Sequence, residues 1–70
     1  MLAVYKVIEL VGTSPSSWEE AAKSAVEAAS ATLRDLRIAE VTDLDMQLED
    51  GSVVAYRAKV KISFKHEVGS

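Results

Sequence analysis

Residues 13–37 read TSPSSWEEAAKSAVEAASATLRDLR, and this stretch decides the fold that the sequence predicts. Its apolar residues recur at spacings of three and four, which places them on one stripe of a helix with 3.6 residues per turn. Ser14 is a good N-cap residue, and Pro15 then takes the first helical position, where a missing N–H costs little. We therefore predict one amphipathic helix here, with Arg34 and Arg37 giving it a basic end. The apolar stripe comprises Trp18, Ala21, Ala22, Ala25, Ala29, Leu33 and Leu36.

The stripe is mostly alanine, so the helix can lie close to a flat surface although each alanine buries little area. The chain has 70 residues and no cysteine, so neither a disulfide nor a thiolate metal site can stabilise its core. A single core in so small a domain rarely supplies more than about 3–5 kcal/mol. Yet 49% of the residues are hydrophobic. We therefore expect one domain over residues 1–70 that places its surplus apolar surface in subunit contacts, as an obligate oligomer.

Extended segments flank the helix. Residues 2–11 are rich in β-branched and aromatic types and predict a first strand. Residues 37–49 and 52–65 predict a second and a third strand, joined by the Asp50-Gly51 hairpin signal. The order strand, helix, strand, strand indicates an α+β fold, in which one small three-stranded antiparallel sheet wraps on one helix.

Alternation then assigns the faces of the last two strands. In the third strand the apolar residues at even positions, from Val54 to Phe64, should receive the helix, and we expect Phe64 and Leu33 to be buried there. The other face of this strand carries a row of cations, either a solvated surface or a surface for an anionic ligand. That row consists of Arg57, Lys59, Lys61 and Lys65. In the second strand, strict alternation separates Ile38, Leu44, Met46 and Leu48 from Ala39, Val41, Asp43, Asp45 and Gln47.

Composition argues against several classes of protein. The net charge is −3 and the pI is about 5.0, so the chain lacks the basic footprint of a nucleic-acid-binding protein. No apolar run approaches the roughly 20 residues that cross a bilayer. We expect no nucleic-acid or membrane partner and a cytoplasmic location. An enzyme is not expected either, because no cysteine nucleophile and no Ser-His-Asp set is present, and the single histidine, His66, lies near a terminus and is given no role.

The order of these pieces, at matching spacing and length, makes the sequence similar to the dodecin family. The resemblance covers about residues 3–67. It is carried by VYKVIELVGTS at 4–14, the long helix, AEV at 39–41 and VKISF at 60–64. It implies a β-α-β-β subunit and a hollow shell of twelve copies with tetrahedral symmetry. It also implies that flavins bind in pairs at subunit interfaces, for sequestration rather than for catalysis.

The chain departs from the family pattern at the flavin position. Flavin-binding dodecins carry a stacking tryptophan where this chain has Ile38, and a glutamine that hydrogen-bonds the ring's polar edge where it has Arg57. Isoleucine has no π face, and aromatic stacking is worth about 0.5–1.5 kcal/mol per pair beyond the buried area. The resemblance therefore implies weak binding of FMN or riboflavin, and it places the chain nearer the subgroup without this pair, which includes calcium dodecin.

Two other functions stay open beside a ligand-binding shell: calcium binding, and a purely structural assembly with no ligand. Carboxylates near the second strand offer the oxygen atoms that Ca²⁺ prefers, but they lack EF-hand spacing, so a solvated surface is the alternative. These carboxylates are Glu40, Asp43 and Asp45, with Glu49 and Asp50 at the hairpin.

Two further side chains invite an interpretation. Arg57 could pair with Glu40 or with a ligand phosphate, because a guanidinium binds both groups well. Trp18 is the one tryptophan, but it lies at the helix start rather than at the family's stacking position. We expect Trp18 to be a packing residue near the base of the helix.

Overall fold

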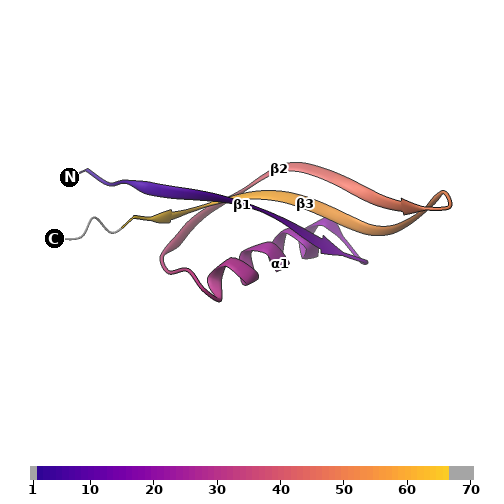
Figure 1. Cartoon of the computed structure of the whole chain (residues 1–70), viewed down its shortest axis with the longest axis horizontal. Coiled ribbons are helices and arrows are strands. Elements are labelled where there is room, and N and C mark those ends of the chain that lie inside the picture. Colours follow the sequence, from indigo (N-terminus) through magenta and orange to yellow (C-terminus); the bar gives the residue numbers. More distant parts are fainter. Residues whose placement is uncertain (1, 67–70) are drawn as a thin grey trace.

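The computed structural model describes residues 2–66, in which three strands and one helix follow the order β1, α1, β2, β3 (Figure 1). The strands are antiparallel neighbours in the order β1-β3-β2, so β3 is central. The predicted α+β fold, with one antiparallel sheet and one helix, is confirmed. The elements span Tyr5–Ser14 (β1), Trp18–Ser30 (α1), Leu36–Glu49 (β2) and Ser52–Lys65 (β3).

The observed strand boundaries agree best with the predicted ones for β2 and β3. Both β2 and β3 match their predicted ranges to within one residue, and Asp50 and Gly51 form the turn between them with positive φ values of 50° and 80°. By contrast, β1 begins and ends three residues later than predicted. Gly12 lies within this strand, and a glycine is needed there because the helix comes very close: a Cβ at Gly12 would overlap the carbonyl oxygen of Ala21.

The predicted start of the helix is wrong. The N-cap is Ser17, whose Oγ accepts a hydrogen bond from the Glu20 N–H at 3.1 Å. Ser14 closes the turn that follows β1 instead, since its Oγ accepts a hydrogen bond from the Ser16 N–H at 3.0 Å. Serine side chains often bond nearby backbone groups in turns as well as at caps, so residue type alone does not separate the two. The S-x-x-E spacing of Ser17 and Glu20 is the capping-box signal for the observed start.

The helix also ends earlier than predicted. It stops at Ser30, so its last turn has no basic residue, and Arg34 and Arg37 lie beyond it. Asp35 then adopts a φ of 59°, a left-handed conformation that aspartate tolerates better than most residues, and the chain turns into β2. Leu33 and Leu36 continue the helical spacing in the sequence, but they pack against the core from outside the helix.

The core lies between α1 and the two strands that it covers, β1 and β3. As predicted, the alanine stripe of α1 meets the alternating apolar face of β3. Phe64 and Leu33 were expected to be buried and are only half-buried. Leu33 follows the last helical turn, and Phe64 pairs with Leu36 beyond the same end of the helix. The buried apolar residues are Ala21, Ala25, Ala29, Ala58, Val60 and Ile62.

The predicted faces of β2 are wrong because this strand is bulged. Its register against β3 shifts between Val41 and Asp43, so Thr42 is an extra residue there, and its Oγ1 donates a hydrogen bond to the Lys59 carbonyl at 3.2 Å. An extra residue moves every later side chain to the other face of a strict alternation. The helix-side row of β2 therefore consists of Ala39, Val41, Leu44 and Met46, opposite Ile62, Val60, Ala58 and Tyr56.

This helix-side row is not covered by α1. Beyond Leu36, every residue of β2 is exposed in the single chain, and Figure 1 shows the β2–β3 hairpin continuing past the start of the helix. The chain measures 55 × 20 × 14 Å, and its radius of gyration is 14.6 Å. A compact domain of this length would have a radius of gyration of about 11 Å. The subunit is thus elongated and open along one edge of its sheet.

Candidate functional site

The outer face of the sheet, away from α1, brings the candidate ligands together with the row of cations. Residues directly opposite each other in an antiparallel sheet share a face, so their side chains are neighbours. Three candidate carboxylates of β2 each lie opposite a cation of β3, whereas Glu49 lies opposite Ser52. The pairs are Asp45 with Arg57, Asp43 with Lys59 and Glu40 with Lys61. The carboxylates considered for calcium and the cations considered for an anion therefore balance each other in charge.

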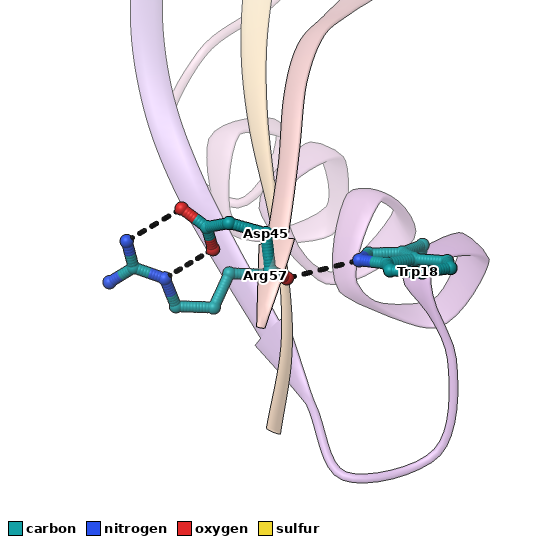
Figure 2. Close-up of polar contacts among 3 residues, drawn as sticks. All are labelled: Trp18, Asp45 and Arg57. Atoms are coloured by element: carbon teal, nitrogen blue, oxygen red, sulfur yellow. Dashed lines mark hydrogen bonds and ion pairs between the residues drawn. The ribbon is translucent and has the colours of Figure 1, made fainter. Parts of the chain in front are cut away.

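One of these pairs is a two-point ion pair (Figure 2). The Arg57 Nε donates to Asp45 Oδ1 at 2.7 Å, and its Nη2 donates to Asp45 Oδ2 at 2.9 Å. Such bidentate contacts fix both side chains in one geometry. The predicted pairing of Arg57 with Glu40 is wrong, because the register places Glu40 opposite Lys61. The hydrogen bond from Arg57 holds the pKa of Asp45 below its ordinary value, and the same bond raises the pKa of Arg57.

The backbone of Asp45 is tied to the helix as well. Trp18 Nε1 donates to the Asp45 carbonyl oxygen at 3.0 Å, and Figure 2 shows Trp18 and Arg57 reaching this residue from opposite sides. The Trp18 ring also meets Tyr56 edge-to-face, with ring centroids 5.1 Å apart. The packing role expected for Trp18 is confirmed. Its partner could not be read from the sequence, because the contact spans 27 residues and depends on the register of β2.

Ile38 lies on the outer face at the other end of β2, opposite Ser63, and its side chain is 64% exposed. Ser63 and Arg57 are six residues apart on β3, which corresponds to about 20 Å at 3.3 Å per residue. One isoalloxazine ring cannot reach both Ile38 and Arg57 of the same chain. A ligand site that uses both positions therefore needs two subunits.

Two hollows of the described residues lie near these elements, and neither joins Ile38 to Arg57. A shallow apolar hollow of about 140 Å³ includes Ile38, Leu36 and Val26, where β2 leaves the end of α1. A larger polar hollow of about 440 Å³ lies between the end of β1 and the helix, and Ser14, Glu20 and Lys23 are among its lining residues. Neither contains Arg57.

The carboxylates of residues 2–66 do not form a metal cluster within one chain. Within the part of the chain that the structure describes, no group of three or more His, Cys, Asp or Glu side chains is arranged to hold a metal ion. Both carboxylate oxygens of Asp45 already accept hydrogen bonds from Arg57. Calcium takes six to eight oxygen ligands, so Glu40, Asp43 and Asp45 would need oxygens from another chain or from water. Nor does the described region contain a helix of the length and apolar character that spans a membrane.

Comparisons with known proteins agree with this fold and extend it. The model of the Dodecin family matches residues 4–67. The chain is 45% identical over 64 residues to calcium dodecin from Mycobacterium tuberculosis, covering 91% of this chain and 90% of that protein. The structure of dodecin from Streptomyces coelicolor superposes with a TM-score of 0.89 at 42% identity, over 96% of each chain. The crystal structure of the calcium-chelating antigen calcium dodecin from M. tuberculosis, which has a calcium-binding site described as novel, gives a TM-score of 0.83 at 43% identity, again over 96% of each chain.

Proposed function

The chain belongs to the dodecin family, and we propose that it forms a non-enzymatic homododecameric shell that binds a small ligand between its subunits. Members of this family form homododecamers and are known as small-ligand-binding proteins rather than enzymes. We take residues 1–70 as one domain, which is the subunit of the shell. The cytoplasmic location expected from the sequence stays a prediction, which cell fractionation would test.

The uncovered apolar row of β2 is the observation that carries this proposal. Val41, Leu44 and Met46 are 47%, 52% and 47% exposed in the single chain. They continue, strand by strand, the same apolar layer that α1 covers over β3. Burying apolar area yields about 25 cal/mol per Å², so a row of this kind favours association over exposure to water. Other copies of the chain are the partners that complete it.

The ligand position is the second part of the proposal. Ile38 and Arg57 occupy the positions where the family carries its flavin-stacking tryptophan and its hydrogen-bonding glutamine. They lie too far apart in one chain to hold one ring, which supports a site shared by two subunits. Ile38 supplies no aromatic face, and Arg57 is already bound to Asp45. We therefore assign the shell weak affinity for FMN and riboflavin.

Restoring the family pair tests this assignment. Stacking and hydrogen bonding together should make Ile38→Trp with Arg57→Gln bind riboflavin about tenfold more tightly than the parent, since about 1.4 kcal/mol is tenfold in affinity. Quenching of riboflavin fluorescence measures both proteins at equal concentration. A parent that already quenches riboflavin as strongly as the double variant would show that binding does not depend on these positions.

Calcium binding is the second candidate function, and the 45% identity to calcium dodecin favours it. Glu40 and Asp43 are the carboxylates that remain outside the Arg57 ion pair, so we assign them to the site, with Asp45 at its margin. Calorimetric titration of the dialysed shell with Ca²⁺ tests this, with Glu40→Gln and Asp43→Asn expected to weaken any binding. A shell that binds neither riboflavin nor Ca²⁺ would be a purely structural assembly.

A further inference from the structure

We propose that Asp45 is a positioning residue that closes the flavin position through Arg57, so that reversing the family's two substitutions restores only part of the flavin affinity. This inference rests on the proposed function and deepens it. Asp45 lies on β2, beside Arg57 of β3. It is not one of the two positions at which this chain departs from the family pattern.

The side chains of Arg57 and Asp45 bind each other through two hydrogen bonds. Arg57 gives two of its N–H groups to Asp45, and both carboxylate oxygens of Asp45 are used in return, at 2.7 and 2.9 Å. On the other side of Arg57, β1 presents Thr13, which carries no charge. Of the two residues directly opposite Arg57 on the neighbouring strands, Asp45 is therefore the charged one, and it sets the position of the guanidinium.

The backbone of Asp45 is held independently of its carboxylate. Its carbonyl oxygen accepts the hydrogen bond from Trp18 Nε1, at 3.0 Å, on the helix side of the sheet. The carboxylate extends from the outer side (Figure 2). Replacing the carboxylate by an amide removes the charge while this backbone contact remains, because the main-chain carbonyl is unchanged. The side chain can thus be tested without loosening the strand from the helix.

The chemistry of the ring edge explains why the carboxylate matters. The pyrimidine edge of isoalloxazine presents a carbonyl, an N–H and a second carbonyl, so it needs both a donor and an acceptor. An ionised carboxylate only accepts hydrogen bonds, and it repels the two ring carbonyls. If Arg57 alone becomes glutamine, Asp45 loses its partner and takes the hydrogen bond of the introduced amide. The amide is then turned away from the ring, and an unpaired charge lies beside the ligand.

Glu9 of β1 provides a control on the same face. It lies opposite Lys61 rather than Arg57. Among the described residues it makes no ion pair within 4.0 Å, whereas Asp45 does. Glu9→Gln therefore removes the same charge from the shell without releasing the group at position 57.

The experiment compares riboflavin affinity in four assembled proteins by fluorescence quenching: the parent, one double variant and two triple variants. The triple variant Ile38→Trp, Asp45→Asn, Arg57→Gln should bind about fivefold more tightly than the double variant Ile38→Trp, Arg57→Gln, in line with the effect of leaving one charged group unpaired. Glu9→Gln in the same double background should leave the affinity unchanged. Asp45→Asn alone should keep the mass of the shell and the emission maximum of Trp18, which shows that the backbone contact remains.

The outcomes separate the two levels of the argument. Equal affinity of the double and triple variants, with both tighter than the parent, would overturn the role of Asp45 and leave the proposed ligand position standing. An equal gain from Glu9→Gln would also overturn it, because the effect would then follow net charge and not the pair. No gain over the parent in either variant, with the shell intact, would overturn the proposed ligand position and the role of Asp45 with it.

Discussion

The two edges of the sheet have opposite surroundings. The edge formed by β1 is covered by α1, and Gly12 lets the helix backbone come within contact of the strand. The edge formed by β2 has no such cover, and all of its residues after Leu36 are exposed. The same apolar face therefore runs from a closed half to an open half. The chain therefore completes only one half of its core by itself.

The core of the closed half is too small to make a single chain a stable independent domain. Three of its six buried apolar residues are alanines of the helix, and a fourth is Ala58 of β3. Val60 and Ile62 are the largest fully buried side chains. Folding must offset roughly 1–2 kcal/mol of backbone entropy per residue, which favours a fold whose open half also becomes buried.

Placing a charge in the open half should have the largest effect on assembly of the shell. Leu44→Asp puts a carboxylate into the helix-side row of β2, where association would bury it without a partner, at a cost of several kcal/mol in every copy. We expect the shell to be lost, as measured by light scattering. Asp43→Asn, one residue away on the outer face, should leave the shell intact. A Leu44→Asp protein with the mass and melting temperature of the parent would contradict the assigned role of the row.

A cavity in the closed half should cost less. Ile62 is 1% exposed, and Ile62→Ala should destabilise the protein by about 2–5 kcal/mol. Leu33→Ala should cost less than Ile62→Ala, because Leu33 is only half-buried. Denaturant unfolding at matched protein concentration compares the two variants, since the stability of an oligomer depends on concentration. An equal or larger loss of stability for Leu33→Ala would contradict this account, because the centre of the core would then lie near the C-terminal end of α1.

Removing the contact between Trp18 of α1 and Asp45 of β2, which joins the two halves, should lower stability by a still smaller amount. Trp18→Phe keeps an aromatic ring against Tyr56 but removes the hydrogen bond from Nε1 to the Asp45 carbonyl. We expect a loss of about 1 kcal/mol, the usual net value of one hydrogen bond. Tyr56→Phe retains the ring contact and serves as the control. A Trp18→Phe protein as stable as the parent would mean that the hydrogen bond to Asp45 does not stabilise the contact between α1 and β2.

The ion pair on the outer face should have the smallest effect. Because Arg57 lowers the pKa of Asp45 in the folded state, the contribution of the pair is present above the ordinary value of 3.8 and is lost as the pH falls through the lowered pKa. NMR titration of the Asp45 carboxyl carbon should give a midpoint below 3.8, and Arg57→Gln should raise it. Both side chains are about half exposed, so overall stability should change little. A midpoint that Arg57→Gln leaves unmoved would mean that the pair is absent in solution.

Much of this comparison could be predicted from the sequence, because its signals are local. The alternation of β3 gave the buried positions, and Asp50-Gly51 gave the hairpin. The helix start was missed because Ser14-Pro15 imitates a cap, although Ser17 with Glu20 carries the better signal.

The site was less predictable than the fold, because it depends on register. Nothing in the residue types around Thr42 marks the bulge that changes the faces of β2. Without that bulge, neither the pairing of Asp45 with Arg57 nor the open apolar row could be assigned. Ile38 and Arg57 were identified through the family resemblance and not through the physical pattern of the chain.

The mass of the folded protein in solution shows whether other copies of the chain complete the open half of the sheet. Light scattering at micromolar concentration should then give about twelve times the chain mass of 7.6 kDa, together with a cooperative unfolding transition. A folded, cooperatively unfolding monomer of 7.6 kDa would contradict completion by other copies, because the row of Val41, Leu44 and Met46 would then be stable in water without a partner.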